Sequence, residues 1–166
     1  MIIEVGNIGH IQQIQDIAKK TWAVTYRDLL SEDQIAYMLD MMYSNKALTE
    51  QMTQLGHHFF MIRQDDADHW QGFVSYEFNY DGQTKTKLHK LYLLPECHGA
   101  GMGKILVNKV REEARKNDNA IIFLNMNRDN KTKNFYEHMG FRIVREEDNY
   151  IGNGYWMIDY VFEIDA

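Results

Sequence analysis

A glycine-rich segment beyond the middle of the chain has the residues best suited to bind a ligand. It runs His98-Gly99-Ala100-Gly101-Met102-Gly103-Lys104, directly after an apolar strand-like stretch and directly before a helical pattern. Glycine lets backbone amides approach a ligand without obstruction by a Cβ atom. The first turn of a helix adds amide donors and a partial positive charge. We therefore expect an anion site of a kind that suits a pyrophosphate.

Two other phosphate-binding motifs do not fit this segment. A P-loop ends in Gly-Lys-Ser or Gly-Lys-Thr, whereas Gly103-Lys104 is followed by Ile105, and the position of its first glycine is His98. A dinucleotide-binding fingerprint would need its third glycine at Lys104. A strand-to-helix turn that uses glycine without binding any ligand remains an alternative.

The elements around this segment follow from the spacing of apolar residues. Before it, we expect a strand at 1–5, helices at 7–22, 31–42 and 45–55, and strands at 58–63, 72–80 and 84–94. After it, we expect helices at 101–116 and 130–139, and strands at 121–126, 141–145 and 155–164. Asp81-Gly82 indicates a hairpin turn. Because strands joined by a helical crossover are parallel, the sequence predicts a mixed α/β sheet with helices on both faces.

Two motifs at a characteristic separation resemble those of a known family. The run His98-x-x-Gly101-x-Gly103 resembles the Arg/Gln-x-x-Gly-x-Gly/Ala signature of the GNAT N-acetyltransferase superfamily. The later run Asn130-Lys131-Thr132-Lys133-Asn134-Phe135-Tyr136-Glu137-His138-Met139-Gly140-Phe141 resembles its Asn-…-Phe-Tyr-…-Gly-Phe segment. The resemblance extends over essentially the whole chain. It implies a single N-acetyltransferase domain over residues 1–166, with a twisted, mostly antiparallel mixed sheet of about seven strands.

The resemblance also implies acetyl-CoA as co-substrate and no metal. In this family the cofactor lies between two splayed central strands, with its pyrophosphate on the glycine turn. The contacts implied for this chain are Leu91, Tyr92 and Leu93 in the strand, His98, Gly99, Ala100, Gly101, Met102, Gly103 and Lys104 in the turn, and Asn130, Lys133 and Asn134. The sequence departs from the family at His98, which replaces Arg or Gln. Asn125 lies about where some protein N-terminal acetyltransferases have a glutamate base.

Tyr136 and His89 are the candidate catalytic residues for direct attack of an amine on the thioester. A thiol has a reference pKa of ~8.5 and tyrosine one of ~10, so Tyr136 could protonate the leaving sulfur. The alternative is that Tyr136 is an aromatic residue of the hydrophobic core without a catalytic role. Histidine titrates near neutral pH, which suits His89 as a base, directly or through water. Glu77 and Tyr92 are other candidates for the base. A further alternative is that the enzyme has no dedicated base.

Other reactive side chains give weaker patterns. A thiol nucleophile is one interpretation of Cys97 next to His98, but adjacent side chains of an extended chain point apart, and packing is the favoured interpretation. His57-His58 does not have a metal-ligand spacing, so no metal site is predicted.

Three residues near the joint of the first two helices are candidates for the acceptor site. Trp22 and Tyr26 could line an amine pocket with Asp28 or Glu32 as counter-charge, or the aromatic rings could join the two helices. Thr21-Trp22…Thr25-Tyr26 and Gly152-Asn153-Gly154-Tyr155 loosely resemble small-molecule acetyltransferases, including polyamine-type members. The predicted acceptor is therefore the primary amine of a small molecule. A protein N-terminus or lysine, or a non-catalytic acyl-CoA-binding role, are the alternatives.

Composition limits the partners. The net charge of −6 argues against nucleic acid, and no stretch approaches the about 18 apolar residues of a transmembrane helix, so no membrane partner is expected. The single cysteine, Cys97, and the absence of a signal-peptide pattern at the start suggest a cytoplasmic protein. A homodimer through the C-terminal strands is left open.

Overall fold

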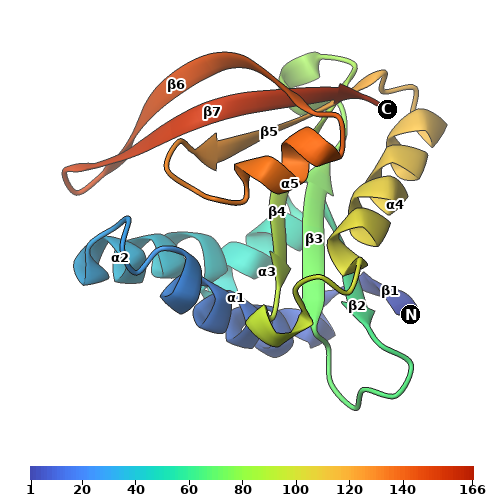
Figure 1. Cartoon of the computed structure of the whole chain (residues 1–166), viewed down its shortest axis with the longest axis horizontal. Coiled ribbons are helices and arrows are strands. Elements are labelled where there is room, and N and C mark those ends of the chain that lie inside the picture. Colours follow the sequence, from blue (N-terminus) through green and yellow to red (C-terminus); the bar gives the residue numbers. More distant parts are fainter. The chain divides into compact units, whose positions relative to one another are not determined.

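The structure, a computed structural model, describes residues Met1–Ala166. Its strands form a seven-stranded sheet in the order β1-β2-β3-β4-β5-β7-β6 (Figure 1). The chain divides into two compact units: unit 1 comprises Met1–Glu77 and Leu88–Val110, and unit 2 comprises Phe78–Lys87 and Arg111–Ala166. The mixed α/β architecture with a mostly antiparallel sheet confirms the predicted fold class.

Unit 1 contains the N-terminal strand and the first three helices. These are β1 (Ile2–Gly6), the 3-10 helix η1 (Ile8–His10), α1 (Ile11–Thr25), α2 (Glu32–Tyr43) and α3 (Asn45–Thr53). Ser31 begins α2 as predicted, since its side chain accepts a hydrogen bond from the Gln34 amide at 3.1 Å. Ser44 caps α3 in the same way through the amide of Ala47. Both helices therefore begin where a hydroxyl side chain binds a backbone amide of the first turn.

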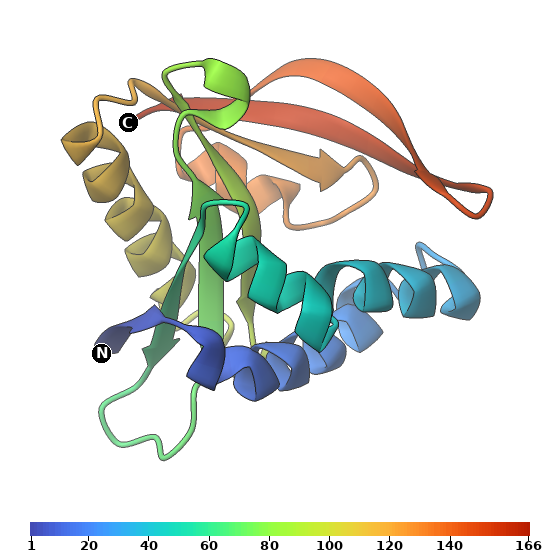
Figure 2. The ribbon, with the colours of Figure 1, turned by 180° about the vertical axis from the view of Figure 1, so that it is seen from behind.

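The strands of unit 1 pair with their neighbours in sequence. They are β2 (His57–Arg63), β3 (Gly72–Glu77) and, from Leu88 onward, β4 (Lys85–Leu93). β2 is antiparallel to both β1 and β3. Gly72 permits a close approach of β4, because a Cβ at this position would lie 2.3 Å from the side chain of Leu93. α1 and α3 lie on one face of these strands, and α4 (Met102–Lys116) begins on the other (Figures 1 and 2).

Unit 2 contains the start of β4 and the C-terminal elements. These are η2 (Tyr80–Gly82), the end of α4, β5 (Ile121–Asn127), α5 (Lys133–His138), β6 (Arg142–Gly152) and β7 (Tyr155–Asp165). Lys85–Lys87 of β4 pair in parallel with Ile121–Phe123 of β5, which confirms the predicted parallel neighbours. β7 lies between β5 and β6 and is antiparallel to both.

Element boundaries differ from the predictions where side-chain hydrogen bonds or exposure decide them. β6 extends to Gly152 rather than ending at 145, although most of its side chains are exposed. Its pairing with β7, and not burial, maintains this strand. α5 begins at Lys133 rather than at 130, because Asn130 Oδ1 accepts a hydrogen bond from the Thr132 amide at 2.9 Å and forms a turn there. α1 continues to Thr25, beyond the predicted end at 22.

No helix of the structure is both long enough and apolar enough to span a membrane.

Candidate active site

The glycine turn of unit 1 contains two glycines in a left-handed conformation. Gly99 and Gly101 have φ angles of 83° and 78°, in the left-handed region that favours glycine. No atom lies within 4 Å of a Cβ built at either residue. The backbone is therefore accessible to a ligand on the side where any other residue would carry a side chain.

The first turn of α4 follows this glycine turn directly. The amide of Ile105 bonds to the carbonyl of Gly101, so the helical ladder begins there. The amides of Met102, Gly103 and Lys104 precede this first bond and are not used by the helix itself. Met102 is fully buried and anchors the helix start in the core of unit 1. A fixed helix N-terminus next to two open glycines can bind an anion through main-chain donors.

His98, where the family signature has Arg or Gln, has a local structural role. Its Nε2 donates a hydrogen bond to the carbonyl of Leu93 at 3.2 Å, which joins the glycine turn to the end of β4. Neighbouring Cys97 is buried, and this burial raises the pKa of its thiol, with a further contribution from Glu96. Since the thiolate is the reactive form, the surroundings of Cys97 disfavour a nucleophilic role.

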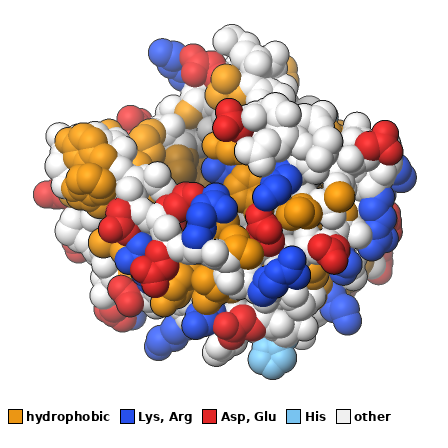
Figure 3. All heavy atoms as spheres, turned by 90° about the horizontal axis from the view of Figure 1, so that it is seen from above, with side chains coloured by type: hydrophobic (Ala, Val, Ile, Leu, Met, Phe, Trp, Pro, Cys, Tyr) orange, Lys and Arg blue, Asp and Glu red, His pale blue; other side chains and the backbone are white.

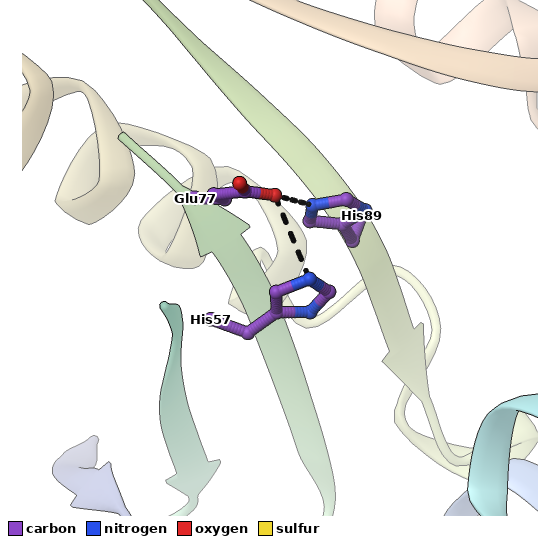
Figure 4. A group of neighbouring side chains, drawn as sticks. All are labelled: His57, Glu77 and His89. Carbon is purple, nitrogen blue, oxygen red and sulfur yellow. Dashed lines mark hydrogen bonds and ion pairs between the residues drawn. The ribbon is translucent and has the colours of Figure 1, made fainter. Parts of the chain in front are cut away.

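His89 of β4 forms a compact cluster that sequence reasoning missed. Its Nε2 lies 2.8 Å from Oε2 of Glu77 on β3, and Nε2 of His57 on β2 lies 3.5 Å from the same oxygen (Figure 4). The two imidazole rings are stacked, with centroids 4.0 Å apart. If His89 Nε2 carries the hydrogen of this contact, Nδ1 carries the basic lone pair. The carboxylate thus orients His89 as it would orient a base.

The aromatic residues proposed for the acceptor site belong to a packed cluster in unit 1. The ring of Trp22 lies 4.5 Å from that of Tyr26, 6.0 Å from Tyr43 and 6.1 Å from Tyr92. Trp22 is 2% exposed and Tyr26 9% exposed, whereas the side chain of Asp28 is 90% exposed. The structure therefore brings Trp22 and Tyr26 together but leaves Asp28 in solvent. Contact of these residues with an acceptor stays a prediction.

Tyr136 lies in unit 2, where it is 5% exposed on α5. Its ring packs against Phe141 and Phe162 at centroid distances of 5.4 and 6.1 Å. This packing fixes the direction of the hydroxyl, which suits a residue that must donate a proton at one position. The roles of Tyr136 and His89 in catalysis stay predictions.

The other predicted cofactor contacts of unit 2 lie in or just before the same helix. Asn130 is buried and its Oδ1 holds the turn that precedes α5. Lys133 has its ammonium 3.7 Å from Glu137 and 5.3 Å from the ring centroid of Tyr160. Asn134 is exposed.

A pocket of about 390 Å³ in unit 2 is lined by both basic and acidic side chains. Lys85, Lys87 and Arg145 are its basic residues, and Glu147 and Glu163 are among its acidic ones. Figure 3 shows the same mixture over the face on which β6 and β7 lie, where basic and acidic side chains alternate with apolar ones.

Asn125 in this pocket binds two carboxylates that sequence reasoning did not connect. Its Nδ2 donates to Glu147 Oε2 at 2.9 Å, and its amide also favours the charged form of the nearby Asp159 carboxyl group. Burial, reinforced by the charge of Glu147, raises the pKa of Asp159 to about 6. A carboxyl group with this pKa can exchange a proton near neutral pH, which Asn125 itself cannot do.

Replacing Asp159 by asparagine is expected to stabilise the protein more at pH 8 than at pH 4. The native pKa is raised, so ionisation destabilises the folded state progressively as the pH rises from 3.8 to about 6. Above that range the penalty is roughly 2–3 kcal/mol, which the neutral amide removes. Urea unfolding of both proteins at the two pH values measures the difference. An equal change in stability at pH 4 and pH 8 would contradict the raised pKa.

Comparison with known proteins identifies the family. A family model described as an acetyltransferase (GNAT) domain matches residues 26–164, and the chain belongs to this family. An uncharacterised N-acetyltransferase of Mycobacterium tuberculosis is 26% identical over 133 residues, which are 79% of this chain and 82% of that protein. The membership predicted from the two motifs is confirmed, and with it the assignment as an N-acetyltransferase.

Solved structures agree with the fold. The structure of the PaiA N-acetyltransferase of Thermoplasma acidophilum, determined in complex with coenzyme A, has a TM-score of 0.81 at 23% identity. The similarity covers 100% of this chain and 100% of that one. A GCN5-related N-acetyltransferase from Rhodopseudomonas palustris has a TM-score of 0.82 at 15% identity, over 99% of this chain and 95% of that one.

Proposed function

We propose that this protein transfers the acetyl group of acetyl-CoA to a primary amine of a small molecule, such as a polyamine. The observation that carries the proposal is the pair of open, left-handed glycines, Gly99 and Gly101, directly before the N-terminus of α4. This backbone offers amide donors of the kind that bind a pyrophosphate. The coenzyme A bound to the similar Thermoplasma acidophilum protein supports the same ligand here.

In the proposed reaction the amine nitrogen attacks the thioester carbonyl directly. A nitrogen–carbon bond forms, the carbon–sulfur bond breaks, and the acetyl group leaves CoA. His89, oriented by Glu77, takes the proton that the amine loses. Tyr136 donates a proton to the departing sulfur, and the hydroxyl later regains one from solvent. Asn130, Lys133 and Asn134 of unit 2 are proposed to contact the cofactor, together with Leu91–Leu93 of β4.

The acceptor is proposed to be a small cationic amine for two reasons. The net charge of −6 favours a cationic substrate over an anionic one. Trp22 and Tyr26 provide aromatic rings of a kind that binds cations, and their cluster includes Tyr92 of the strand proposed to contact the cofactor.

The proposal is tested by thiol release from acetyl-CoA with a panel of acceptors, in the presence of a metal chelator. We expect release with small primary amines that exceeds release with peptides bearing a free N-terminus or lysine. Turnover of peptides but not of small amines would contradict the small-molecule acceptor and indicate a protein acceptor instead. Tight CoA binding without turnover of any acceptor would indicate a non-catalytic acyl-CoA-binding domain and would contradict the proposal.

We also propose that the protein forms a homodimer. Exposed apolar side chains on β6 and β7, among them Tyr150 and Trp156 with ring centroids 5.2 Å apart, support a homodimer through the C-terminal strands. Light scattering of the purified protein measures its mass in solution. The expected lack of nucleic-acid and membrane partners and the cytoplasmic location also stay predictions.

A further inference from the structure

Three side chains that are distant in sequence meet on one face of three adjacent strands in unit 1. His57 on β2 is paired directly with Glu77 on β3 in the antiparallel register, so their side chains leave the sheet on the same side. His89 is on β4, the next strand in the sheet. Both histidines direct Nε2 toward one carboxylate oxygen, Oε2 of Glu77 (Figure 4).

The donor atoms are spaced almost as a metal ion requires. In a tetrahedral zinc site, bonds of 2.0–2.2 Å place neighbouring donors about 3.3 Å apart. The distance from Glu77 Oε2 to His57 Nε2 is 3.5 Å and that to His89 Nε2 is 2.8 Å. One ligand atom from each of the three residues lies within 4.8 Å of the others. To bind an ion, the carboxylate would shift and the stacked rings would rotate out of their parallel arrangement, so that both Nε2 lone pairs face the ion.

The surroundings also suit a bound ion. The side chains of His57, Glu77 and His89 are 11%, 24% and 17% exposed, so the cluster is reachable from solvent but only partly hydrated. All three residues belong to strands that hydrogen bonds hold in register. Little conformational entropy would be lost on binding, because the backbone already holds the donors close together.

We propose that His57, Glu77 and His89 form a binding site for a divalent transition-metal ion of the zinc type. Two imidazole nitrogens and one carboxylate oxygen match the ligand preference of Zn²⁺, Fe²⁺, Co²⁺ and Ni²⁺, whereas Mg²⁺ prefers oxygen ligands alone. Three protein ligands leave a fourth position of a tetrahedral ion for water or a small anion. The site shares Glu77 and His89 with the proposed acetyl transfer, in which His89 acts as the base of the metal-free protein, but zinc binding is measured without any turnover.

Titration of the tag-free, metal-free protein with zinc chloride in a calorimeter tests the site. We expect one zinc ion per chain, and at least about tenfold weaker binding for His57→Ala and for His89→Ala. Glu77→Gln retains the shape but loses the negative charge, and is expected to weaken binding as well. Magnesium chloride in place of zinc is expected to give no binding heat.

His58→Ala is the matched control, since His58 neighbours His57 on the same strand but stacks on Tyr76 instead. Its zinc affinity is expected to equal that of the unmodified protein. Anomalous diffraction at the zinc edge, from crystals of the unmodified protein, should give a peak between the three side chains even if a variant fails to fold. Absence of zinc binding, a peak elsewhere, or equal affinity in His57→Ala and His58→Ala would overturn the proposal.

Discussion

Tyr136→Phe is expected to lower kcat for amine acetylation about a hundredfold while leaving the affinity for CoA nearly unchanged, since general-acid catalysis contributes roughly 10²–10⁴-fold. The substitution removes only the hydroxyl. The ring is 5% exposed, and a phenyl group would fill the same space against Phe141 and Phe162. Without the hydroxyl, the leaving thiolate must take its proton from water, or depart unprotonated. The effect should therefore appear in kcat and not in binding.

Steady-state kinetics with the best acceptor, together with calorimetric binding of CoA, separates the two quantities. Tyr160→Phe provides a matched control, because Tyr160 is also an aromatic residue of unit 2 with its ring 6.3 Å from Phe162. It should retain full kcat. Equal rates for Tyr136→Phe and Tyr160→Phe would show that Tyr136 is an ordinary core aromatic. Thermal unfolding of both variants verifies that neither loses its fold.

Gly101→Val is expected to weaken CoA binding about 5- to 30-fold, through the backbone and not through a clash. No atom lies within 4 Å of the position of the new Cβ, so space is available. The φ angle of 78°, however, is unfavourable for any L-residue by about 1–2 kcal/mol, and more for a β-branched one. The turn should relax to another conformation that misdirects its amides. CoA binding would then have to supply the free energy that returns the turn to its left-handed conformation, and this cost reduces the affinity about 5- to 30-fold.

Calorimetric titration with CoA measures this loss, and Gly56→Val is the control. Gly56 also lies in unit 1, has a φ angle of 73° and has no atom within 4 Å of a Cβ. Both substitutions should lower the melting temperature by similar amounts, but only Gly101→Val should weaken CoA binding. If the two variants bound CoA equally well, the glycine turn would not be the pyrophosphate site.

The predictions that the structure confirmed depend on short stretches of sequence. Ser31 predicts a helix start because the cap is a contact between residues three positions apart. Gly99, Gly101 and Gly103 indicate a turn between a strand and a helix, and the structure adds that Gly99 and Gly101 are left-handed, a conformation that glycine adopts without strain. The fold class followed from the order of strand and helix patterns, and the family from two motifs within residues 98–141. The extent of β6 was missed because an exposed, charged strand lacks the alternation that burial imposes.

By itself, the sequence determined the family, the fold class and the position of the glycine turn, because each is encoded by neighbouring residues. Only the tertiary structure brought His57, Glu77 and His89 to one oxygen, since strand register decides which side chains meet, and a slip of one residue would turn them to opposite faces. Likewise, the raised pKa of Asp159 arises from burial beside Glu147 across the β6–β7 pair. Both clusters depend on pairings between distant segments, which no local pattern specifies.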